Sequence, residues 1–564
     1  MANSIPRAEH PNPQFERENW LNLNGEWEFE IDNSVSGRER GLQNAEHLSS
    51  KIIVPFCPES RLSGVENTDF MNCVWYRRDI EISESKLEGI VILHFGAVDQ
   101  TATVWCNGVE LATHTGGYLP FTVDITEVLA KENTILVCVR DATNKSQLPR
   151  GKQTLHPHGI WYTPQSGIWQ TVWLESVPQN YIRSLHVTPL FDAHQVEITV
   201  EGEGQCMIDL EGKRFTFPAG VPAHVPVQSF RPWSPEHPTL YPFSVTLGDD
   251  TVYSYFAMRK CSVETDKDGV RRLFLNGKPY FHNGLLDQGY WPDGLYTAPS
   301  DDALVYDIQL AKDMGFNMLR KHIKIEPLRW YYHCDRLGII VWQDLVSCFE
   351  RWQTLTMQVL PFLGLHLHDA PSARLGRAGE AGRRQFLRDM EDTVDLLYNC
   401  VCLGLWVPFN EGWGQFDALA VTDRLRTLDP TRPIDHASGW HDQGGGDLKS
   451  RHVYYRPVRL RGDGRRVLAL TEFGGYSLQC PGHLASDKKF GYRMYDHAAA
   501  WMDAVERLYE TEVLPLIESQ GLSAAVYTQL SDVEDEVNGL VTYDRRLCKM
   551  DPARMRKINS KLRF

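Results

Sequence analysis

Two β-rich stretches stand out in the spacing of apolar and polar residues along the first half of the chain. From about 20 to 177, short runs of alternating apolar and polar residues are separated by Gly, Asn, Asp and Pro, which is typical of antiparallel strands joined by turns. The same pattern continues in shorter runs from about 181 to 262. Many short strands with turns between them favour sandwiches and jelly rolls. We therefore predict a β jelly roll over residues 1–180 and an immunoglobulin-like β-sandwich over residues 181–262.

From about residue 263 the pattern changes to apolar runs that alternate with helical segments. Ser300 can cap a helix that continues to a stop at Gly315. Eight segments are strand-like: KPYFHNGLL, GFNMLRKH, IIVWQDL, VCLGLWVPF, RPIDHAS, RHVYY, RVLALT and SAAVYTQLS. Near-continuous apolar strands alternating with helices predict a parallel (β/α)8 TIM barrel over residues 263–564, with its chemistry at the C-terminal ends of the strands.

Composition narrows the class of protein. The 564 residues carry a formal net charge of −15 and no long block of like charge, so neither nucleic acid nor an anionic membrane is an expected partner. The first residues lack a secretory signal pattern and no apolar run reaches about 18 residues, which predicts a cytoplasmic protein. The 12 cysteines include no Cys-x-x-Cys, and neither His-Glu-x-x-His nor a phosphate-binding glycine loop occurs. We expect no metal and no cofactor.

Two predicted barrel strands end in a glutamate. Glu411 follows the fourth strand in VCLGLWVPFNEGWGQ, and Glu472 ends the seventh in RVLALTEFGGYS. Two carboxylates on separate strand ends are the minimal equipment for breaking a glycosidic bond. Aromatic neighbours such as Trp413 would desolvate Glu411 and favour its protonated form, so we assign Glu411 as acid/base and Glu472 as nucleophile. Gly474 and Gly475 would leave space for a sugar ring, and a separation of about 5–5.5 Å would give retention of configuration.

Other residues near the strand ends are candidates for binding substrate. Asn410 is placed to hydrogen-bond a ring hydroxyl, with the 2-hydroxyl preferred. After the first barrel strand, Asp287 and Gln288 are candidate hydroxyl binders and Trp291 a stacking platform, with packing in the core as the alternative for Trp291. His322 would touch the sugar or orient a glutamate, and a purely structural histidine is the alternative.

Several sequence blocks occur in an order shared with a known enzyme family. LNLNGEWEFEID, WYRRDI, GGYLPFTVDIT and GIWQTVWLE are followed by LNGKPYFHNGLLDQGYWPDG, GFNMLRKH, HCDRLGIIVWQDL, WVPFNEGWG and LTEFGG. The chain thereby resembles glycoside hydrolase family 2, which includes β-galactosidases, β-glucuronidases and β-mannosidases. The resemblance implies Glu411 as acid/base and Glu472 as nucleophile, with Asn410 and Arg320 supporting the site. It also implies that Tyr454 donates a hydrogen bond to the nucleophile.

Departures from the family pattern leave the identity of the sugar open. Family glucuronidases read the substrate carboxylate with an Asn-x-Lys element, and the similar stretch here is Asn-Gly-Leu at 538–540. A uronate would then need another cation, and the candidates are Arg351, Arg456, Lys321 and Lys324, since an arginine meets a carboxylate through two hydrogen bonds. A surface or structural charge is the alternative for each of them.

These patterns together predict a glycoside hydrolase. We expect a retaining exo-β-glycosidase that removes galactose-configured sugars from a β-galactoside or β-galacturonide by double displacement. A β-glucuronidase or other β-hexuronidase is the alternative among enzymes, and a catalytically inactive carbohydrate-binding protein is the alternative of another class. The expected partner is a small glycoside or an oligosaccharide, and the sequence is compatible with a homo-oligomer.

Overall fold

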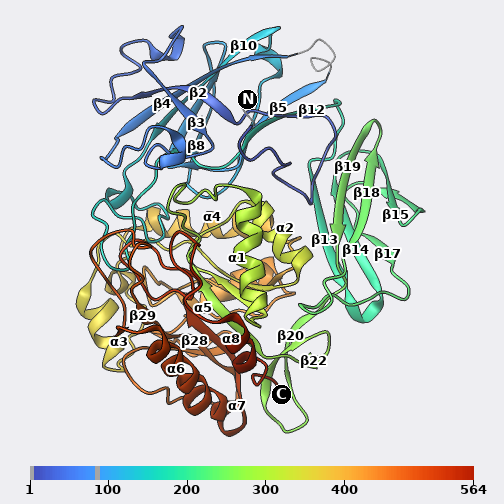
Figure 1. The fold of residues 1–564 in the computed structure, drawn as a ribbon. Coiled ribbons are helices and arrows are strands. Elements are labelled where there is room, and N and C mark those ends of the chain that lie inside the picture. Colours follow the sequence, from blue (N-terminus) through green and yellow to red (C-terminus); the bar gives the residue numbers. More distant parts are fainter. Residues whose placement is uncertain (1–4, 83–88) are drawn as a thin grey trace.

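The chain folds into an N-terminal β unit, a β-sandwich and a barrel (Figure 1). The computed structural model describes residues 5–82 and 89–564, so residues 1–4 and 83–88 of the predicted jelly roll lie outside the described residues. In Figure 1 the blue N-terminal unit lies above the barrel, and the green sandwich lies to the right. None of the described helices is long and apolar enough to cross a membrane.

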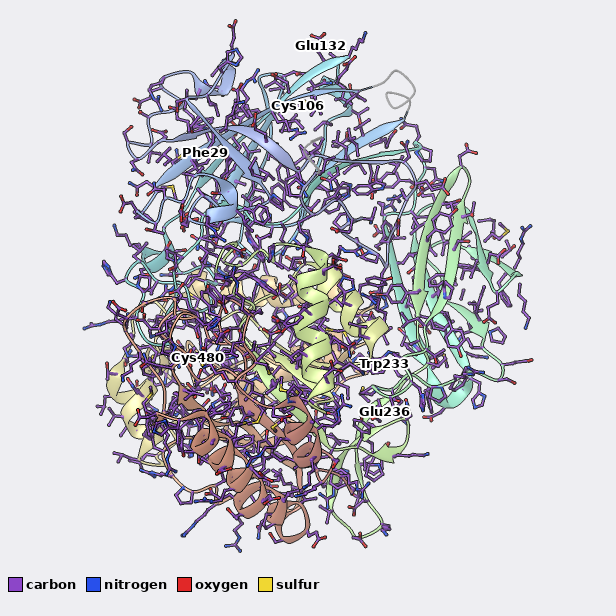
Figure 2. All side chains as sticks on the ribbon, in the orientation of Figure 1. Phe29, Cys106, Glu132, Trp233, Glu236 and Cys480 are labelled. Carbon is purple, nitrogen blue, oxygen red and sulfur yellow. The ribbon has the colours of Figure 1, made fainter. Side chains whose placement is uncertain are left out.

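Two antiparallel sheets form the N-terminal unit. The four-stranded sheet has the order β1 (Trp20–Asn22), β12 (Val172–Val177), β5 (Ile90–Phe95) and β9 (Phe121–Asp124). The six-stranded sheet has the order β3 (Ser50–Val54), β2 (Gly25–Ile31), β4 (Cys73–Glu81), β10 (Glu132–Arg140), β7 (Thr101–Cys106) and β8 (Val109–Thr115). Phe29 from one sheet and Phe95 from the other belong to a single buried core, and Phe29 is labelled in Figure 2. The predicted jelly-roll class is confirmed.

The sandwich also consists of two antiparallel sheets. One holds β13 (Ser184–Leu190), β14 (Gln195–Glu201) and β17 (Ala223–Pro226); the other holds β16 (Lys213–Pro218), β15 (Gln205–Leu210), β18 (Tyr241–Leu247) and β19 (Asp250–Phe256). Along β14, buried Val196, Ile198 and Val200 alternate with less buried residues, as the sequence pattern indicated. The sequence did not predict β16 and β17, because both are short and end in proline.

Seven parallel strands form the barrel sheet. Their order is β26 (Leu403–Val407), β25 (Ile340–Asp344), β24 (Met318–Lys321), β23 (His282–Asp287), β31 (Leu522–Thr528), β28 (Val467–Gly474) and β27 (Leu448–Val453). The predicted fifth strand at 432–438 is irregular and joins β26 through two isolated bridges, Trp406 to Ile434 and Asn410 to Ser438. Pro433 has no N–H to donate, which explains why a regular ladder does not form there. The predicted TIM barrel is otherwise confirmed.

Helices surround this sheet, and smaller strands complete the chain. The helices are α1 (Asp301–Asp313), α2 (Leu328–Leu337), α3 (Leu360–Phe362), α4 (Glu380–Leu397), α5 (Ala418–Leu428), α6 (Ala498–Leu508), α7 (Leu514–Gln520) and α8 (Pro552–Asn559). The smaller strands are β6 (Val98–Asp99), β11 (Gly167–Ile168), β20 (Cys261–Thr265), β21 (Arg271–Leu275), β22 (Lys278–Pro279), β29 (Tyr476–Leu478) and β30 (Arg493–Tyr495). The Ser300 hydroxyl accepts a hydrogen bond from the amide of Ala303, which is the predicted start of α1.

A long connection links the N-terminal unit to the barrel. Residues 141–166 leave β10, cross to the barrel and return to β11, and part of this segment is the teal chain that descends from the blue unit in Figure 1. The amides of Arg150 and Gly151 both donate to the carbonyl of Ser347, just beyond β25, at 3.2 and 3.1 Å. The N-terminal unit therefore contributes residues to the end of the barrel where the strands finish.

Candidate active site

The structure brings Glu411 and Glu472 together at the C-terminal ends of the barrel strands. Glu472 lies in β28 opposite His452 of β27, and Glu411 follows β26 with a left-handed φ of 52°. One carboxylate oxygen of each glutamate and a ring nitrogen of His452 all lie within 4.8 Å of one another. The glutamates are 7% and 5% exposed, so both are largely buried.

His452 contacts both glutamates. Its Nδ1 lies 2.7 Å from Oε1 of Glu411 and 3.5 Å from Oε2 of Glu472, and its Nε2 lies 3.4 Å from a guanidinium nitrogen of Arg320. Because a guanidinium only donates, Nε2 is the acceptor and Nδ1 carries the hydrogen that is donated to Glu411. Burial and the charge of Arg320 lower the pKa of His452 well below its usual value. The ring is therefore neutral and fixed in one tautomer.

The surroundings of the two glutamates differ. Glu472 accepts hydrogen bonds from Arg320 at 3.1 Å and from the hydroxyl of Tyr454 at 2.7 Å. Burial raises the pKa of Glu472, and both of these donors oppose the rise. Burial and the nearby charge of Glu472 raise the pKa of Glu411 well above its usual value. Glu411 is thus the carboxyl group suited to hold a proton, and Glu472 the one suited to remain ionised.

Arg320 connects the strand ends beneath the glutamates. Its guanidinium, which is fully buried, donates to both oxygens of Asp344 at 2.9 and 3.1 Å and to Oδ1 of Asn410 at 2.8 Å. The Nδ2 of Asn410 is buried and has no partner among the described residues. Since its oxygen is held by Arg320, the free amide hydrogens point to Asn410 as a donor to a bound ligand.

A cluster of aromatic rings includes Trp413, which follows Glu411 by two residues. We define the aromatic cluster as Trp161, Phe349, Trp352 and Trp413, with ring centroids 5.1 to 6.2 Å apart. Trp413 is buried, and its Nε1 has no hydrogen-bond partner among the described residues. His322 lies 6.3 Å from Trp413, and its Nδ1 lies 2.8 Å from Asp344. His322 therefore lies at the site and is held by a carboxylate.

The two glycines after Glu472 serve a different purpose from the predicted one. A Cβ on Gly474 would lie 2.3 Å from the ring of Tyr527, and a Cβ on Gly475 would lie 2.3 Å from the ring of Tyr492. Both glycines also have positive φ. The space that they leave is occupied by aromatic rings, so the prediction that it admits a sugar was wrong.

Three candidate binders after the first barrel strand have partners within the protein. Asp287 pairs with Lys321 at 2.7 Å, and Gln288 donates to Gln529 at 2.9 Å. Trp291 lies in the hydrophobic core of the barrel, with the Arg545 guanidinium 4.3 Å from its ring centroid. The structure therefore favours core packing for Trp291 over a stacking platform. The side chains of Asp287 and Gln288 are bound to Lys321 and Gln529 instead of being free to bind sugar hydroxyls.

Two of the four candidate cations, Lys321 and Lys324, have partners within the protein. Lys321 binds Asp287 and Glu326, and Lys324 binds Glu326 and two backbone carbonyls, so both are neutralised or saturated. Arg351 and Arg456 are exposed, and within the described chain neither has a counter-ion. Arg351 and Arg456 therefore stay candidates, although an exposed cation binds an anion weakly because water competes for it. The correction for Lys321 and Lys324 arises because sequence spacing does not reveal which charges pair across the fold.

One residue beside the glutamates was missed. Lys152, from the connection between β10 and β11, has its Nζ 5.5 Å from the ring of Tyr162 and 5.9 Å from that of Trp413. Its charge lowers the pKa of both glutamates. The length of the connection at residues 141–166 could have indicated a functional residue there, because long irregular segments inside compact domains are usually functional.

Glu411, His452 and Glu472 are also the described residues whose ligand atoms could meet at a metal ion. Arg320 already donates to Glu472, and Lys152 adds a second positive charge nearby. Arg320 and Lys152 would both repel a dication. These residues therefore fit a pair of reacting carboxylates better than the ligands of a resident metal ion.

The chain matches two family models and several relatives of known name. Residues 21–178 match the family model for glycosyl hydrolases family 2, sugar binding domain, and residues 268–457 match that for glycosyl hydrolases family 2, TIM barrel domain. A putative beta-glucuronidase of Formosa agariphila is 26% identical over 353 residues, which cover 57% of this chain and 41% of that protein. A beta-galactosidase of Thermoanaerobacter pseudethanolicus is 26% identical over 394 residues, covering 65% and 48%. The chain thus spans less than half the length of these two relatives.

Solved structures match along almost the whole chain. A beta-glucuronidase from an uncultured Clostridium species has a TM-score of 0.77 at 18% identity, covering 97% of this chain and 99% of that one. A beta-galacturonidase from Eisenbergiella tayi, bound to galacturonate, has a TM-score of 0.72 at 17% identity, covering 99% of each chain. At this level of identity the likeness establishes the fold.

Proposed function

The chain belongs to glycoside hydrolase family 2, and on that premise we propose that it is a retaining exo-acting β-glycosidase. The observation that carries the proposal is that one carboxylate oxygen of Glu411 and one of Glu472 lie within 4.8 Å of each other. Inverting enzymes need about 6.5–9.5 Å between the carboxyl groups to admit a water molecule, whereas retaining enzymes hold them about 5–5.5 Å apart. Both carboxylates are largely buried, which favours a site for one terminal sugar over an open cleft.

In the first step Glu472 attacks the anomeric carbon while Glu411 protonates the departing oxygen. Arg320 and Tyr454 hold the Glu472 carboxylate in position and keep it ionised before attack. The bond to the leaving group breaks as the bond to Glu472 forms, so a glycosyl ester results and the aglycone leaves with the proton of Glu411.

In the second step Glu411 changes its role. Once Glu472 is esterified its negative charge is gone, and with it a main cause of the raised pKa of Glu411. Lys152 and Arg320 still lower that pKa, and the hydrogen bond from His452 favours the carboxylate. Glu411 then takes a proton from water, which attacks the anomeric carbon. The bond to Glu472 breaks, so Glu472 leaves as a carboxylate and the sugar is released with its original configuration.

The class of sugar that the site accepts is a separate part of this proposal. The relatives are named as glucuronidase and galactosidase, and one structural neighbour as galacturonidase. We propose a galactose-configured sugar, neutral or acidic, with a β-glucuronide as the alternative. An inactive carbohydrate-binding protein is disfavoured because both glutamates, Asn410 and their supporting hydrogen bonds are intact.

The test is turnover of a panel of aryl β-glycosides (galactoside, galacturonide, glucuronide and mannoside) with Glu472→Gln as control. We expect the wild type to cleave at least one, the variant to be inactive, and proton NMR to detect the β-anomer first. A 2-deoxy-2-fluoro glycosyl inactivator should label Glu472, as located by peptide mass spectrometry. No turnover and no labelling would support the binding protein, and an α-anomer formed first would remove Glu472 as nucleophile.

A further inference from the structure

Lys152 differs from the other buried lysines around the barrel. Its side chain is 5% exposed, yet within the described part of the chain its ammonium group has no hydrogen-bond acceptor and no ion-pair partner. Lys321 and Lys324 each have acceptors, and Lys549 binds Asp532 and two carbonyls. Unlike buried polar atoms that have no partner, such as Nε1 of Trp413, the Lys152 Nζ keeps some contact with solvent, so its three hydrogens are free to be donated to a ligand.

The backbone on both sides of Lys152 is tightly fixed. Gly151 has a φ of 59°, and a Cβ there would lie 2.9 Å from the carbonyl oxygen of Ile323. The Lys152 carbonyl accepts from the amide of Tyr162 at 3.0 Å, and the side chain of Gln153 donates to Asp99 at 2.9 Å. The ammonium is therefore presented to the barrel from a rigid support, which is the arrangement that binds a ligand at low entropic cost.

Lys152 lies beside the two catalytic glutamates, where a bound sugar would lie, and forms no ion pair with a described residue that would stabilise the fold. It lies near the ring of Trp413 and close enough to influence the pKa of Glu411, Glu472 and His322, but it forms no ion pair with either glutamate. An additional acceptor can thus fit beside it without displacing an existing partner. A carboxylate on the sugar that the glutamates hold would supply such an acceptor.

The stretch that resembles the Asn-x-Lys element offers no cation in this chain. It reads Asn-Gly-Leu at 538–540, and Leu540 is 0% exposed in the core of the barrel. Asn538 is engaged by Glu536 and Gln529. The cation for an acidic sugar therefore has to come from another part of the fold.

We propose that Lys152 binds the carboxylate of a β-hexuronide and makes the substrate class an acidic sugar. The proposal rests on the glycosidase function proposed above. In this arrangement the barrel supplies the two reacting carboxylates, and the N-terminal unit supplies the residue that selects an acidic sugar over a neutral one.

A competing interpretation is that Lys152 only adjusts the charge of the glutamates. In that case its loss would affect every glycoside by the same factor. Pairs of substrates that differ only in the carboxylate distinguish the two interpretations. We would measure kcat/KM for an aryl β-galacturonide and the corresponding β-galactoside, and for an aryl β-glucuronide and the corresponding β-glucoside. Lys152→Met removes the ammonium group and keeps an unbranched side chain one heavy atom shorter, and Lys145→Met on the same connection removes one exposed charge as a control.

We expect Lys152→Met to lower kcat/KM roughly 100-fold on the uronide and less than about 5-fold on the neutral partner, the loss typical of an unmade charged hydrogen bond. Lys145→Met should change neither. Equal losses on both members of a pair, or a wild-type preference for the neutral sugar, would overturn the proposal while leaving the glycosidase function standing. Absence of all turnover and labelling would instead reject the glycosidase function itself.

A measurement on the wild type covers the case in which Lys152→Met does not fold. The free hexuronic acid should inhibit at least about 10-fold more strongly than its uncharged carboxamide, since only the acid presents two anionic oxygens to the ammonium. Equal inhibition by acid and amide would count against Lys152 as the reader of the carboxylate.

Discussion

The Tyr454 hydroxyl lies 2.7 Å from Oε2 of Glu472 and donates its hydrogen to it. The ring of Tyr454 stacks on that of Tyr492 with centroids 3.8 Å apart, so loss of the hydroxyl alone leaves the packing in place. We predict that Tyr454→Phe lowers kcat by about 10- to 100-fold, the effect of losing a hydrogen bond to a charged group. Tyr455→Phe, at a residue that is 65% exposed, is the matched control and should retain full activity.

The same variant should alter the pH dependence. The hydrogen bond from Tyr454 favours the ionised form of Glu472, so removing it raises the pKa of Glu472 further. The acidic limb of kcat/KM should therefore move to higher pH in Tyr454→Phe. An acidic limb that stays in place would show that the hydrogen bond does not control ionisation of the nucleophile.

For the wild type we predict a bell-shaped pH profile set by the two glutamates as a coupled pair. Activity requires Glu472 ionised, so it rises as pH passes through a pKa that burial has raised. Activity also requires Glu411 protonated, so it falls as pH passes through a pKa that burial and the charge of Glu472 raise still further. With an activated leaving group, Glu411→Gln should lose the basic limb. Persistence of that limb would assign it to another group.

Substitution of Glu411 should have an effect that depends on the leaving group. An aglycone that departs only when protonated should be cleaved about 100- to 10,000-fold more slowly by Glu411→Ala, the usual contribution of general acid catalysis. A dinitrophenyl glycoside needs little protonation, so its glycosylation step should be nearly unchanged in a pre-steady-state burst. Azide should then restore turnover and yield a β-glycosyl azide. Equal losses on both substrates would contradict the acid role.

Arg320 should be needed for stability as well as activity. Arg320→Ala leaves Asp344 and Glu472 without their buried counter-ion, so we predict a loss of about 3–5 kcal/mol in the free energy of unfolding, measured with urea. Arg432→Ala is the control, because Arg432 is also buried and pairs with Asp429, which takes no part in the site. It should lose stability but keep activity per folded molecule. Full activity in folded Arg320→Ala would contradict the support that Arg320 gives Glu472.

The aromatic cluster should bind the leaving group. Trp352 is only partly buried, and its ring lies 5.5 Å from Trp161 and 6.2 Å from Trp413, on the side of the acid Glu411. Trp352→Ala should raise KM for aryl glycosides up to about 10-fold through lost ring contacts. The methyl glycoside of the same sugar lacks the ring and serves as the control. A similar rise in KM for both would place Trp352 at the sugar instead.

The sequence predicted the features that depend on local patterns. Buried parallel strands are nearly continuous apolar runs, and polar residues at or just beyond the C-terminal ends of such strands reach the site, as with Glu472 and Glu411. Charge pairing was not predictable in the same way. Lys321 is neutralised by Asp287 from a neighbouring strand, whereas Lys152 enters from a distant unit. Both outcomes depend on contacts between segments far apart in the chain.

The connection at residues 141–166 separates two tasks that many enzymes combine in one set of loops. Bond cleavage depends on strand ends in the barrel, and recognition of an acidic sugar is assigned to a segment of the N-terminal unit. A library of variants confined to this one segment would therefore explore new specificities while the glutamates keep their hydrogen-bond partners Arg320, His452 and Tyr454 in the barrel.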